Sequence, residues 1–283
     1  MTPRKRKGIA LYTASLGLVA ALLAGPVLAG ERDMLLVLPG FPGTSAQAQP
    51  YIDKMLRHLE GKLGWPAGSM SGRYLPDGVQ GSAELASASP GLALVDPSVY
   101  AGQQKALGMK VIAKVEVNGR GEETYSVVVR RGGPGSLAEL KGRTVAGAVV
   151  HDAKYVANVI MGGALEAGEI RTVPEKRPLK ALRDVVRGTV DAAVVDRAVI
   201  EHMAELDFAG EVVILHTSKP VPAPAVVVIG AGVPHASAIA GALVGMCGRP
   251  DGAELCKTLT LTSIKSASDA DYAPLLKRYA SGK

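Results

Sequence analysis

The sequence predicts an α/β fold with two lobes, each a mostly parallel sheet flanked by helices. Strand-like and helix-like segments alternate along most of the chain, a pattern typical of parallel sheets with helices on their faces. Two passages interrupt the alternation, the polar stretch NGRGEE at 118–123 and the proline-spaced stretch at 216–230. Without an expected export signal, 254 residues remain, and typical domains of about 100–150 residues make two lobes a better fit than one.

The N-terminus has the pattern of a cleavable signal peptide. Four basic residues at 4–7 precede a mostly apolar run at 9–23 and the small-residue site Val27-Leu28-Ala29. Threonine and serine interrupt the apolar run, which is shorter than the roughly 20 residues of a membrane span. We therefore expect residues 1–29 to be removed and the mature protein to be periplasmic. The alternative interpretation is a retained membrane anchor.

The charge of the chain belongs largely to this expected signal. The whole sequence has 32 basic and 26 acidic residues, and residues 1–29 hold four of the basic ones and none of the acidic ones. The remainder therefore carries a net charge of +2. A nucleic-acid-binding domain usually shows a basic face or stripe, and none is evident in the sequence. We expect no nucleic-acid partner.

The elements before the first interruption follow from apolar spacing and helix boundaries. Apolar residues recur at helical spacing from Ile52 to Leu63. Pro97 suits the first turn of a helix, where its missing N–H costs nothing. The expected elements are a strand at 35–38, a helix at 52–63, a strand at 69–74, a helix at 79–88, a strand at 92–95, a helix from Pro97 and a strand at 110–117.

A second series of strands and helices follows NGRGEE. Ser136 is a candidate cap for a short helix, with Glu139 placed close to a capping box. Prolines at 220, 222 and 224 exclude a helix there and favour an extended segment. The expected elements are strands at 124–130, 143–150, 190–195 and 211–215, an extended segment at 218–228, and helices at 137–141, 153–167, 178–187, around 197–206, 236–247, 253–259 and 272–279.

The two cysteines, Cys247 and Cys256, flank the turn GRPDG near the C-terminus. In an oxidising compartment their proximity favours a local disulfide, and the alternative is two buried free thiols. The chain has no Cys-x-x-Cys motif, and its five histidines are not at metal-ligand spacing. We therefore expect no metal site and no cofactor.

Five stretches in order along the mature chain resemble the type II periplasmic substrate-binding proteins, in particular the phosphate/phosphonate-type receptors of ABC transporters. The stretches are LALVDPSVY (92–100), SLAELKGRTVA (136–146), VVRGTVDAAVVD (185–196), SKPVPAPAVVV (218–228) and SDADYAPLLK (268–277). The resemblance implies two lobes that close on a ligand about a two-strand hinge. It divides the chain into the signal peptide (1–29), lobe 1 (30–123), lobe 2 (124–223) and a return segment of lobe 1 (224–283).

Candidate ligand-binding residues follow from the rule that ligands of open α/β sheets lie beyond the carboxyl ends of the strands. Most of the candidates also suit a structural role, because Thr44 or Ser45 and the three aspartates can each cap a helix. Tyr100 and His151 have no capping role. The candidates are Phe41, Thr44, Ser45, Asp96 and Tyr100 in lobe 1, and His151, Asp152, Tyr155 and Asp196 in lobe 2.

The start of the expected helix at 153 departs from the family pattern. Phosphate- and phosphonate-binding members usually have a turn rich in serine and threonine at this place, whereas this chain has VVHDAKY. An aspartate there would repel a phosphate unless it were protonated or turned away. A ligand with a cationic or hydrogen-bond-donating part is equally compatible with Asp96, Asp152 and Asp196.

The predicted function is therefore solute binding without catalysis. We expect a monomeric exported protein that closes on a small, phosphate- or phosphonate-like ligand and delivers it to the membrane permease of an ABC transporter. One alternative is a receptor that presents its ligand to a membrane sensor. Another is a secreted α/β-hydrolase, suggested by PGFPG at 39–43, but the nearest candidate for its nucleophile elbow, GSMSG at 68–72, has Met70 in the place of the serine.

Overall fold

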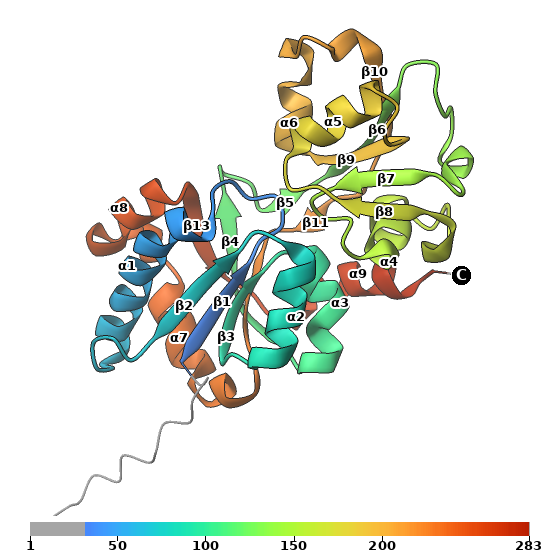
Figure 1. The fold of residues 1–283 in the computed structure, drawn as a ribbon. Coiled ribbons are helices and arrows are strands. Elements are labelled where there is room, and N and C mark those ends of the chain that lie inside the picture. The colour runs from blue at the N-terminus through green and yellow to red at the C-terminus, as the bar shows by residue number, and fades with distance from the viewer. Residues whose placement is uncertain (1–31, 283) are drawn as a thin grey trace, which may run out of the picture.

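The computed structural model describes residues 32–282, which form two lobes joined by a narrow waist (Figure 1). The predicted signal peptide, residues 1–29, lies outside the described residues. Lobe 1 is built around a six-stranded sheet and lobe 2 around a five-stranded sheet. The chain is therefore the two-lobed α/β protein that the sequence predicts.

Lobe 1 contains segments from both ends of the described chain. Its strands are β1 (Asp33–Val37), β2 (Ser71–Leu75), β3 (Leu92–Val95), β4 (Lys110–Val117), β12 (Ala225–Val228) and β13 (Leu261–Ser266), in the order β13-β4-β12-β3-β1-β2. Its helices are α1 (Ser45–Leu63), α2 (Gly78–Ala88), α3 (Pro97–Leu107), α7 (Ala236–Leu243) and α8 (Pro250–Thr258). Helices α2 and α3 lie together on one face of the sheet, and α1, α7 and α8 cover the other (Figure 1).

Lobe 2 consists of one continuous stretch of chain. Its strands are β6 (Tyr125–Arg130), β7 (Thr144–Gly147), β8 (Arg171–Pro174), β9 (Ala192–Asp196) and β10 (Val212–Thr217), in the order β10-β6-β9-β7-β8. Its α-helices are α4 (Ala153–Tyr155), α5 (Pro178–Val186) and α6 (Arg197–Glu201). Helix α5 packs its buried residues against β6 and β9.

Two short strands connect the lobes. Strand β5 (Glu122–Glu123) lies on the path from lobe 1 to lobe 2, and β11 (Val221–Pro222) lies on the path back. They pair antiparallel as a separate two-stranded sheet, with Val221 opposite Glu123. The two crossings thus form a two-strand connection of the kind that the resemblance to type II binding proteins implies.

Both sheets are mixed, whereas the sequence suggested mostly parallel ones. Pairing is parallel for β2-β1-β3 and for β8-β7-β9, and antiparallel wherever β4, β6, β10, β12 or β13 takes part. Strands β4 and β12 of lobe 1 lead to and from the hinge, as do β10 and β6 of lobe 2, and the two strands of each pair run in opposite directions. The parallel strands carry the loops that face the other lobe.

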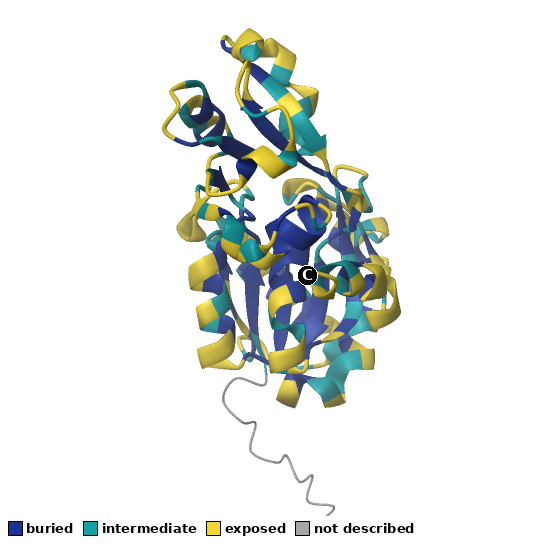
Figure 2. Ribbon diagram, turned by 90° about the vertical axis from the view of Figure 1, so that its right-hand side faces the viewer, coloured by how far each residue is buried: buried dark blue, intermediate teal, exposed yellow. Residues whose placement is uncertain are grey.

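The central strands of lobe 1 are buried on both faces, as sheets covered by helices require. In β1, Leu35 and Val37 belong to the core beneath α2 and α3, whereas Met34 and Leu36 belong to the core beneath α1 and α7. The first of these cores continues through the waist into lobe 2 as buried residues of β6 and β7 (Figure 2). The two lobes therefore share apolar packing next to the hinge.

The C-terminal helix α9 (Asp269–Ala280) joins the hinge and both lobes. It packs against α3 of lobe 1, β11 of the hinge and a π-helical segment of lobe 2, Val156–Ile160. The Tyr272 hydroxyl donates to the Ala223 carbonyl at 2.7 Å, and the Asn158 amide donates to the Tyr279 carbonyl at 2.8 Å. Helix α9 is therefore in contact with lobe 1, the hinge and lobe 2.

Several elements differ from the sequence-based expectation. The helix expected at 153–167 is short, because Gly162 and Gly163 adopt left-handed conformations with φ of 66° and 80° directly after the π-helical segment. The expected helix at 137–141 is a single 3-10 turn, Leu137–Leu140, and the Ser136 side chain does not cap it. Strands β5, β8 and β13 were not predicted.

The two cysteines are joined in a disulfide, with their α-carbons 5.4 Å apart. Cys256 lies on the buried face of α8, and Cys247 lies in the short helical turn Met246–Gly248 before it. The bond therefore ties α8 to the chain that leads from α7.

Candidate functional site

A cavity of about 100 Å³ lies between the lobes, next to the hinge. Loops at the carboxyl ends of β1 and β3 line it from lobe 1, and loops after β7 and β9 line it from lobe 2. The lining residues are Pro39, Gly40, Phe41, Asp96, Pro97, Val117, Arg120, Glu122, Glu123, Tyr125, Ala148, Val149, Pro178, Val194, Val195, Asp196, Pro222, Ala223 and Pro224. This is where ligands of open α/β sheets bind.

The loop after β1 is held so that Phe41 borders the cavity. The Tyr74 hydroxyl donates to the Phe41 carbonyl at 2.8 Å, and the Phe41 amide donates to the Leu38 carbonyl at 3.2 Å. Gly40, with φ of 83°, turns the chain and lies against Ala148 of lobe 2, where an added Cβ would come within 2.7 Å of the Ala148 Cβ. The lobes are thus in direct contact at one edge of the cavity.

Asp96 lies at the cavity wall and is only 3% exposed. Its carboxylate caps α3 by accepting from the Ser98 amide at 2.8 Å, and it also accepts from the Ser98 hydroxyl at 2.5 Å. Burial raises the pKa of Asp96, because the charged form is poorly solvated there, and these hydrogen bonds oppose the rise. The carboxyl group of Asp96 is therefore more readily protonated than an exposed one.

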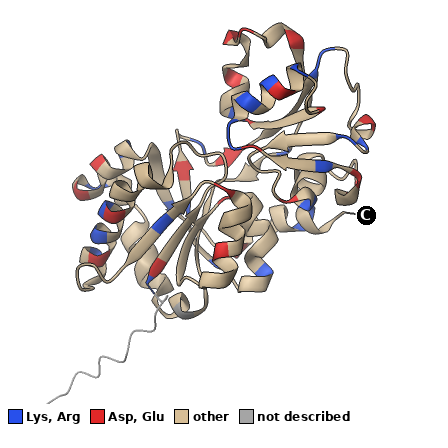
Figure 3. Ribbon diagram, in the orientation of Figure 1, with Lys and Arg blue, Asp and Glu red and all other residues tan. Residues whose placement is uncertain are grey.

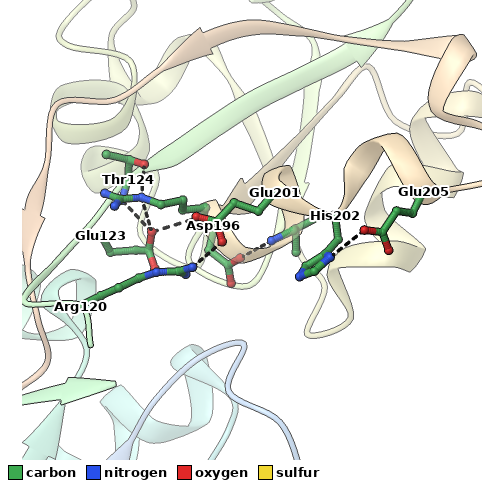
Figure 4. A network of polar contacts seen from close by, with 9 residues as sticks. Arg120, Glu123, Thr124, Asp196, Glu201, His202 and Glu205 are labelled. Atoms are coloured by element: carbon green, nitrogen blue, oxygen red, sulfur yellow. Dashed lines mark hydrogen bonds and ion pairs between the residues drawn. The ribbon is translucent and has the colours of Figure 1, made fainter. Parts of the chain in front are cut away.

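Further acidic and basic groups meet where the hinge joins lobe 2 (Figure 4). Glu123 accepts from the Thr124 amide at 2.8 Å and the Arg197 amide at 3.3 Å, and its pKa is raised, chiefly by burial. Asp196 caps α6 by accepting from the Val199 amide at 3.0 Å. Arg120 of the hinge forms an ion pair with Glu201 of α6. The cavity wall thus combines one guanidinium with several carboxyl groups.

His151 and Asp152 lie beside a second hollow of about 430 Å³, which is open to solvent between α2, α3, α4 and Tyr279. Burial lowers the pKa of His151, and the carboxylates of Asp96, Asp152 and Asp77 oppose this effect. Asp152 caps α4 by accepting from the Tyr155 amide at 3.0 Å and also accepts from the Tyr279 hydroxyl at 2.8 Å. The Asp152 carboxylate therefore occupies the start of α4.

The remaining candidates do not border the cavity. Tyr100 is buried against Tyr272, and its hydroxyl donates to Asp269 at 3.3 Å. Tyr155 is fully buried, and its hydroxyl has no hydrogen-bond partner among the described residues. Thr44 is the exposed cap of α1, and Ser45 donates to the Tyr74 carbonyl at 2.7 Å. The structure therefore brings together Phe41, Asp96 and Asp196 of the nine candidates at the cavity.

Sequence reasoning missed the hinge side of the cavity. Arg120, Glu122 and Glu123 all come from NGRGEE, which was interpreted only as a break between units. Its position directly before the first crossing was the available signal, because residues at a hinge between two lobes border the space that the lobes enclose. Tyr125, the first residue of β6, also lines this side.

Lys and Arg residues are interspersed with Asp and Glu over both lobes in the view of Figure 3. Within residues 32–282, no group of three or more His, Cys, Asp or Glu side chains could hold a metal ion. None of the helices in this range is long and apolar enough to span a membrane.

Comparison with known proteins gives a match to one family model over residues 52–272, described as the periplasmic substrate-binding protein of a phosphonate ABC transporter. No curated protein matches the chain.

Solved structures share the fold at low sequence identity. XAC2383 from Xanthomonas citri, bound to ATP, is 16% identical with a TM-score of 0.66, over 88% of this chain and 96% of that one. A binding protein component of an ABC phosphonate transporter from Pseudomonas aeruginosa is 10% identical with a TM-score of 0.62, over 88% and 85%. PhnD1 from Prochlorococcus marinus, in complex with methylphosphonate, is 10% identical with a TM-score of 0.59, over 88% and 97%.

Proposed function

The chain belongs to the periplasmic substrate-binding proteins of phosphonate ABC transporters, and on this premise we propose that it binds a small phosphonate-like solute in the cavity between its lobes. The observation that supports this proposal is the position of the cavity, which is bordered by strand-end loops of both sheets and by the hinge. A ligand there would contact both lobes at once. Closure about the hinge would then exclude water from it.

We propose that the phosphonyl group lies toward Arg120 and the two carboxyl groups with raised pKa, those of Asp96 and Glu123. A guanidinium offers paired N–H donors that match phosphonyl oxygens. A raised pKa makes it easier for a carboxyl group to take up a proton, and the protonated group can donate a hydrogen bond to such an oxygen. The start of α4 is a poorer place for the anion, because Asp152 already accepts from the Tyr155 amide there.

The lobe boundaries are also part of this proposal. Lobe 1 would comprise residues 30–123 and 224–283, and lobe 2 residues 124–223. The separate pairing of β5 with β11 supports these boundaries, because each strand lies next to one of the proposed limits. We further infer that residues 1–29 direct export and are removed, that the mature protein is a monomer without catalytic activity, and that it delivers its ligand to a membrane permease.

Thermal denaturation of the mature protein with a panel of solutes tests the ligand class. The panel contains methylphosphonate, phosphate, phosphite, a sulfonate, an amino acid and a polyamine. Each is used at about 1 mM, because a concentration ~1000 times a micromolar dissociation constant gives a large thermal shift. We expect methylphosphonate to raise the midpoint most. A rise with the amino acid or polyamine alone would contradict the ligand class, and no rise with any solute would contradict binding in the cavity.

Replacement of a single arginine tests the placement of the anion. Arg120→Gln should weaken methylphosphonate binding about tenfold or more in calorimetry, because a charge-assisted hydrogen bond is worth about 1.5–3 kcal/mol. Arg143→Gln is the matched control, since Arg143 also forms an exposed ion pair, with Asp191 at the opposite end of β9. Equal affinities for the two variants would show that Arg120 does not hold the ligand.

A further inference from the structure

The loop after β7 of lobe 2 contacts lobe 1 at a glycine, Gly78. Gly78 is the first residue of α2, and a Cβ added there would lie 2.3 Å from His151 Nδ1 and 2.5 Å from its Cγ. The imidazole of lobe 2 thus fills the space that any other residue at position 78 would occupy. Its Nδ1 is buried and has no hydrogen-bond partner among the described residues.

The next residue of the loop makes a similar contact with α3. A Cβ added to Gly102 would lie 2.9 Å from Asp152 Oδ2. That oxygen accepts from the Tyr279 hydroxyl at 2.8 Å, while Oδ1 accepts from the Tyr155 amide at 3.0 Å. Because both oxygens are held, the carboxylate cannot swing away from Gly102 without losing a hydrogen bond.

These contacts join the lobes without bordering the cavity. His151 and Asp152 line the neighbouring solvent-exposed hollow, and neither lines the cavity next to the hinge. Asp77, which precedes Gly78, forms an ion pair with Lys176 of lobe 2 at 3.3 Å. The N-terminus of α2 is therefore a point at which a close steric contact and an ion pair both cross from one lobe to the other.

From this geometry we infer that His151 and Asp152 are closure residues, which dock against Gly78 and Gly102 and hold the lobes together around the ligand. They position the lobes and do not contact the solute, so they affect affinity only through the closed state. This inference rests on the proposed function, because closure matters only to a protein that encloses a ligand. It differs from the sequence-based hypothesis, in which both residues bind the ligand directly.

Substitution of Gly78 by alanine tests the inference. The closed arrangement leaves no room for the added methyl group, because packed interfaces tolerate little overlap. Gly61→Ala is the matched control: Gly61 lies in α1, and a Cβ there would meet nothing within 4 Å. Both substitutions replace a helical glycine by alanine.

The readout is the distance between two nitroxide labels, one on each lobe, measured by pulsed electron paramagnetic resonance with and without methylphosphonate. Lys105→Cys and Arg187→Cys are exposed attachment sites on α3 and just after α5, and the native cysteines are already joined to each other. We expect a short-distance population in the otherwise wild-type protein and in Gly61→Ala. Gly78→Ala should reduce the ratio of closed to open molecules on the order of tenfold or more.

A second variant makes the test specific to this contact. Removal of the imidazole in the double variant Gly78→Ala, His151→Ala frees the space, and the short-distance population should recover relative to Gly78→Ala alone. The inference is overturned if Gly78→Ala keeps that population, if the double variant does not recover it, or if the reference protein never shows it. Calorimetry with methylphosphonate on the unlabelled protein separately tests the proposed function, so a Gly78→Ala variant that binds the solute and closes normally contradicts only this inference.

Discussion

Single aspartates in this protein have two roles that the sequence could not separate. Asp96 and Asp196 both cap helices, as their sequence context allows, and both also border the cavity between the lobes. Asp152 caps α4 as well, but it faces the neighbouring hollow and Tyr279. A helix-capping role can be predicted from neighbouring residues. Whether the same carboxylate also borders a cavity depends on segments that are far away in the sequence.

Asp96 provides a prediction about stability and pH. Its folded-state pKa is raised, so its contribution to stability is fully present below the unfolded pKa of about 3.9 and is lost as pH rises through the higher folded value. Asp96→Asn removes this titration and can keep the hydrogen bond from the Ser98 amide. The unfolding free energy of Asp96→Asn, relative to wild type, should therefore increase between pH 4 and pH 7 in urea denaturation.

The companion variant Asp96→Ala separates the cap from the charge. It removes the acceptor for the Ser98 amide and should destabilise the protein by about 0.5–2 kcal/mol at pH 7, as the loss of a helix cap usually does. If the stability of Asp96→Asn relative to wild type did not change with pH, the proposed effect of burial on this carboxyl group would be wrong.

Tyr279 provides a prediction about the link between α9 and lobe 2. Tyr279→Phe removes the hydroxyl that donates to Asp152 and should cost about 0.5–1.5 kcal/mol of unfolding free energy, the usual net worth of a hydrogen bond. Tyr51→Phe is a suitable control, because Tyr51 is exposed on α1. Equal stability of the two variants in urea denaturation would show that the Tyr279 hydroxyl contributes nothing.

Elements with regular apolar spacing were predicted well, and elements defined by tertiary contacts were not. The helix at α1 follows from its apolar face, and the structure adds a capping box between Thr44 and Gln47. By contrast, β13 has the sequence LTSIKS with a single fully buried residue, Ile264, and it is a strand because it pairs with β4 at the edge of the sheet. Short polar edge strands leave little periodic signal.

The disulfide supports one element of lobe 1. Replacement of both cysteines by alanine releases α8 from the turn that follows α7, and the entropy of closing this short loop predicts a loss of about 2–3 kcal/mol. Denaturation with and without a reductant should show the difference in wild type and no effect of the reductant in the double variant. A reductant-sensitive midpoint in the variant would point to a cause other than this bond.

The two-lobed arrangement of the whole molecule was predictable because its connections are marked in the sequence. NGRGEE contains the first crossing strand, β5, and the proline-spaced segment contains the second, β11. The contacts between the lobes could not be predicted in the same way. Which side chain of the loop at 148–152 meets which glycine depends on the angle between two sheets that only the folded hinge determines.

The balance between open and closed molecules should therefore depend on pH through His151. Closure buries the imidazole, which lowers its pKa, so the neutral form favours the closed state and protonation favours an open state in which the ring is hydrated. Three carboxylates oppose the lowering of the His151 pKa: Asp96, Asp152 and Asp77. The pKa of Asp77 is itself lowered by the Gln80 amide and by Lys176. Lys176 and Lys154 also lie on this side of lobe 2.

Asp96 acts in the opposite direction, because its raised pKa means that protonation on acidification favours burial. With the same pair of labels and no ligand, the closed population should fall when the pH is lowered from about 7.5 to about 5.5, across the usual histidine pKa of about 6.5. His151→Asn keeps a polar side chain of smaller size without a titration in this range, so any remaining pH dependence in that variant belongs to the carboxylates. A closed population that stays constant or rises in the wild type on acidification would show that the solvation of His151 does not control closure.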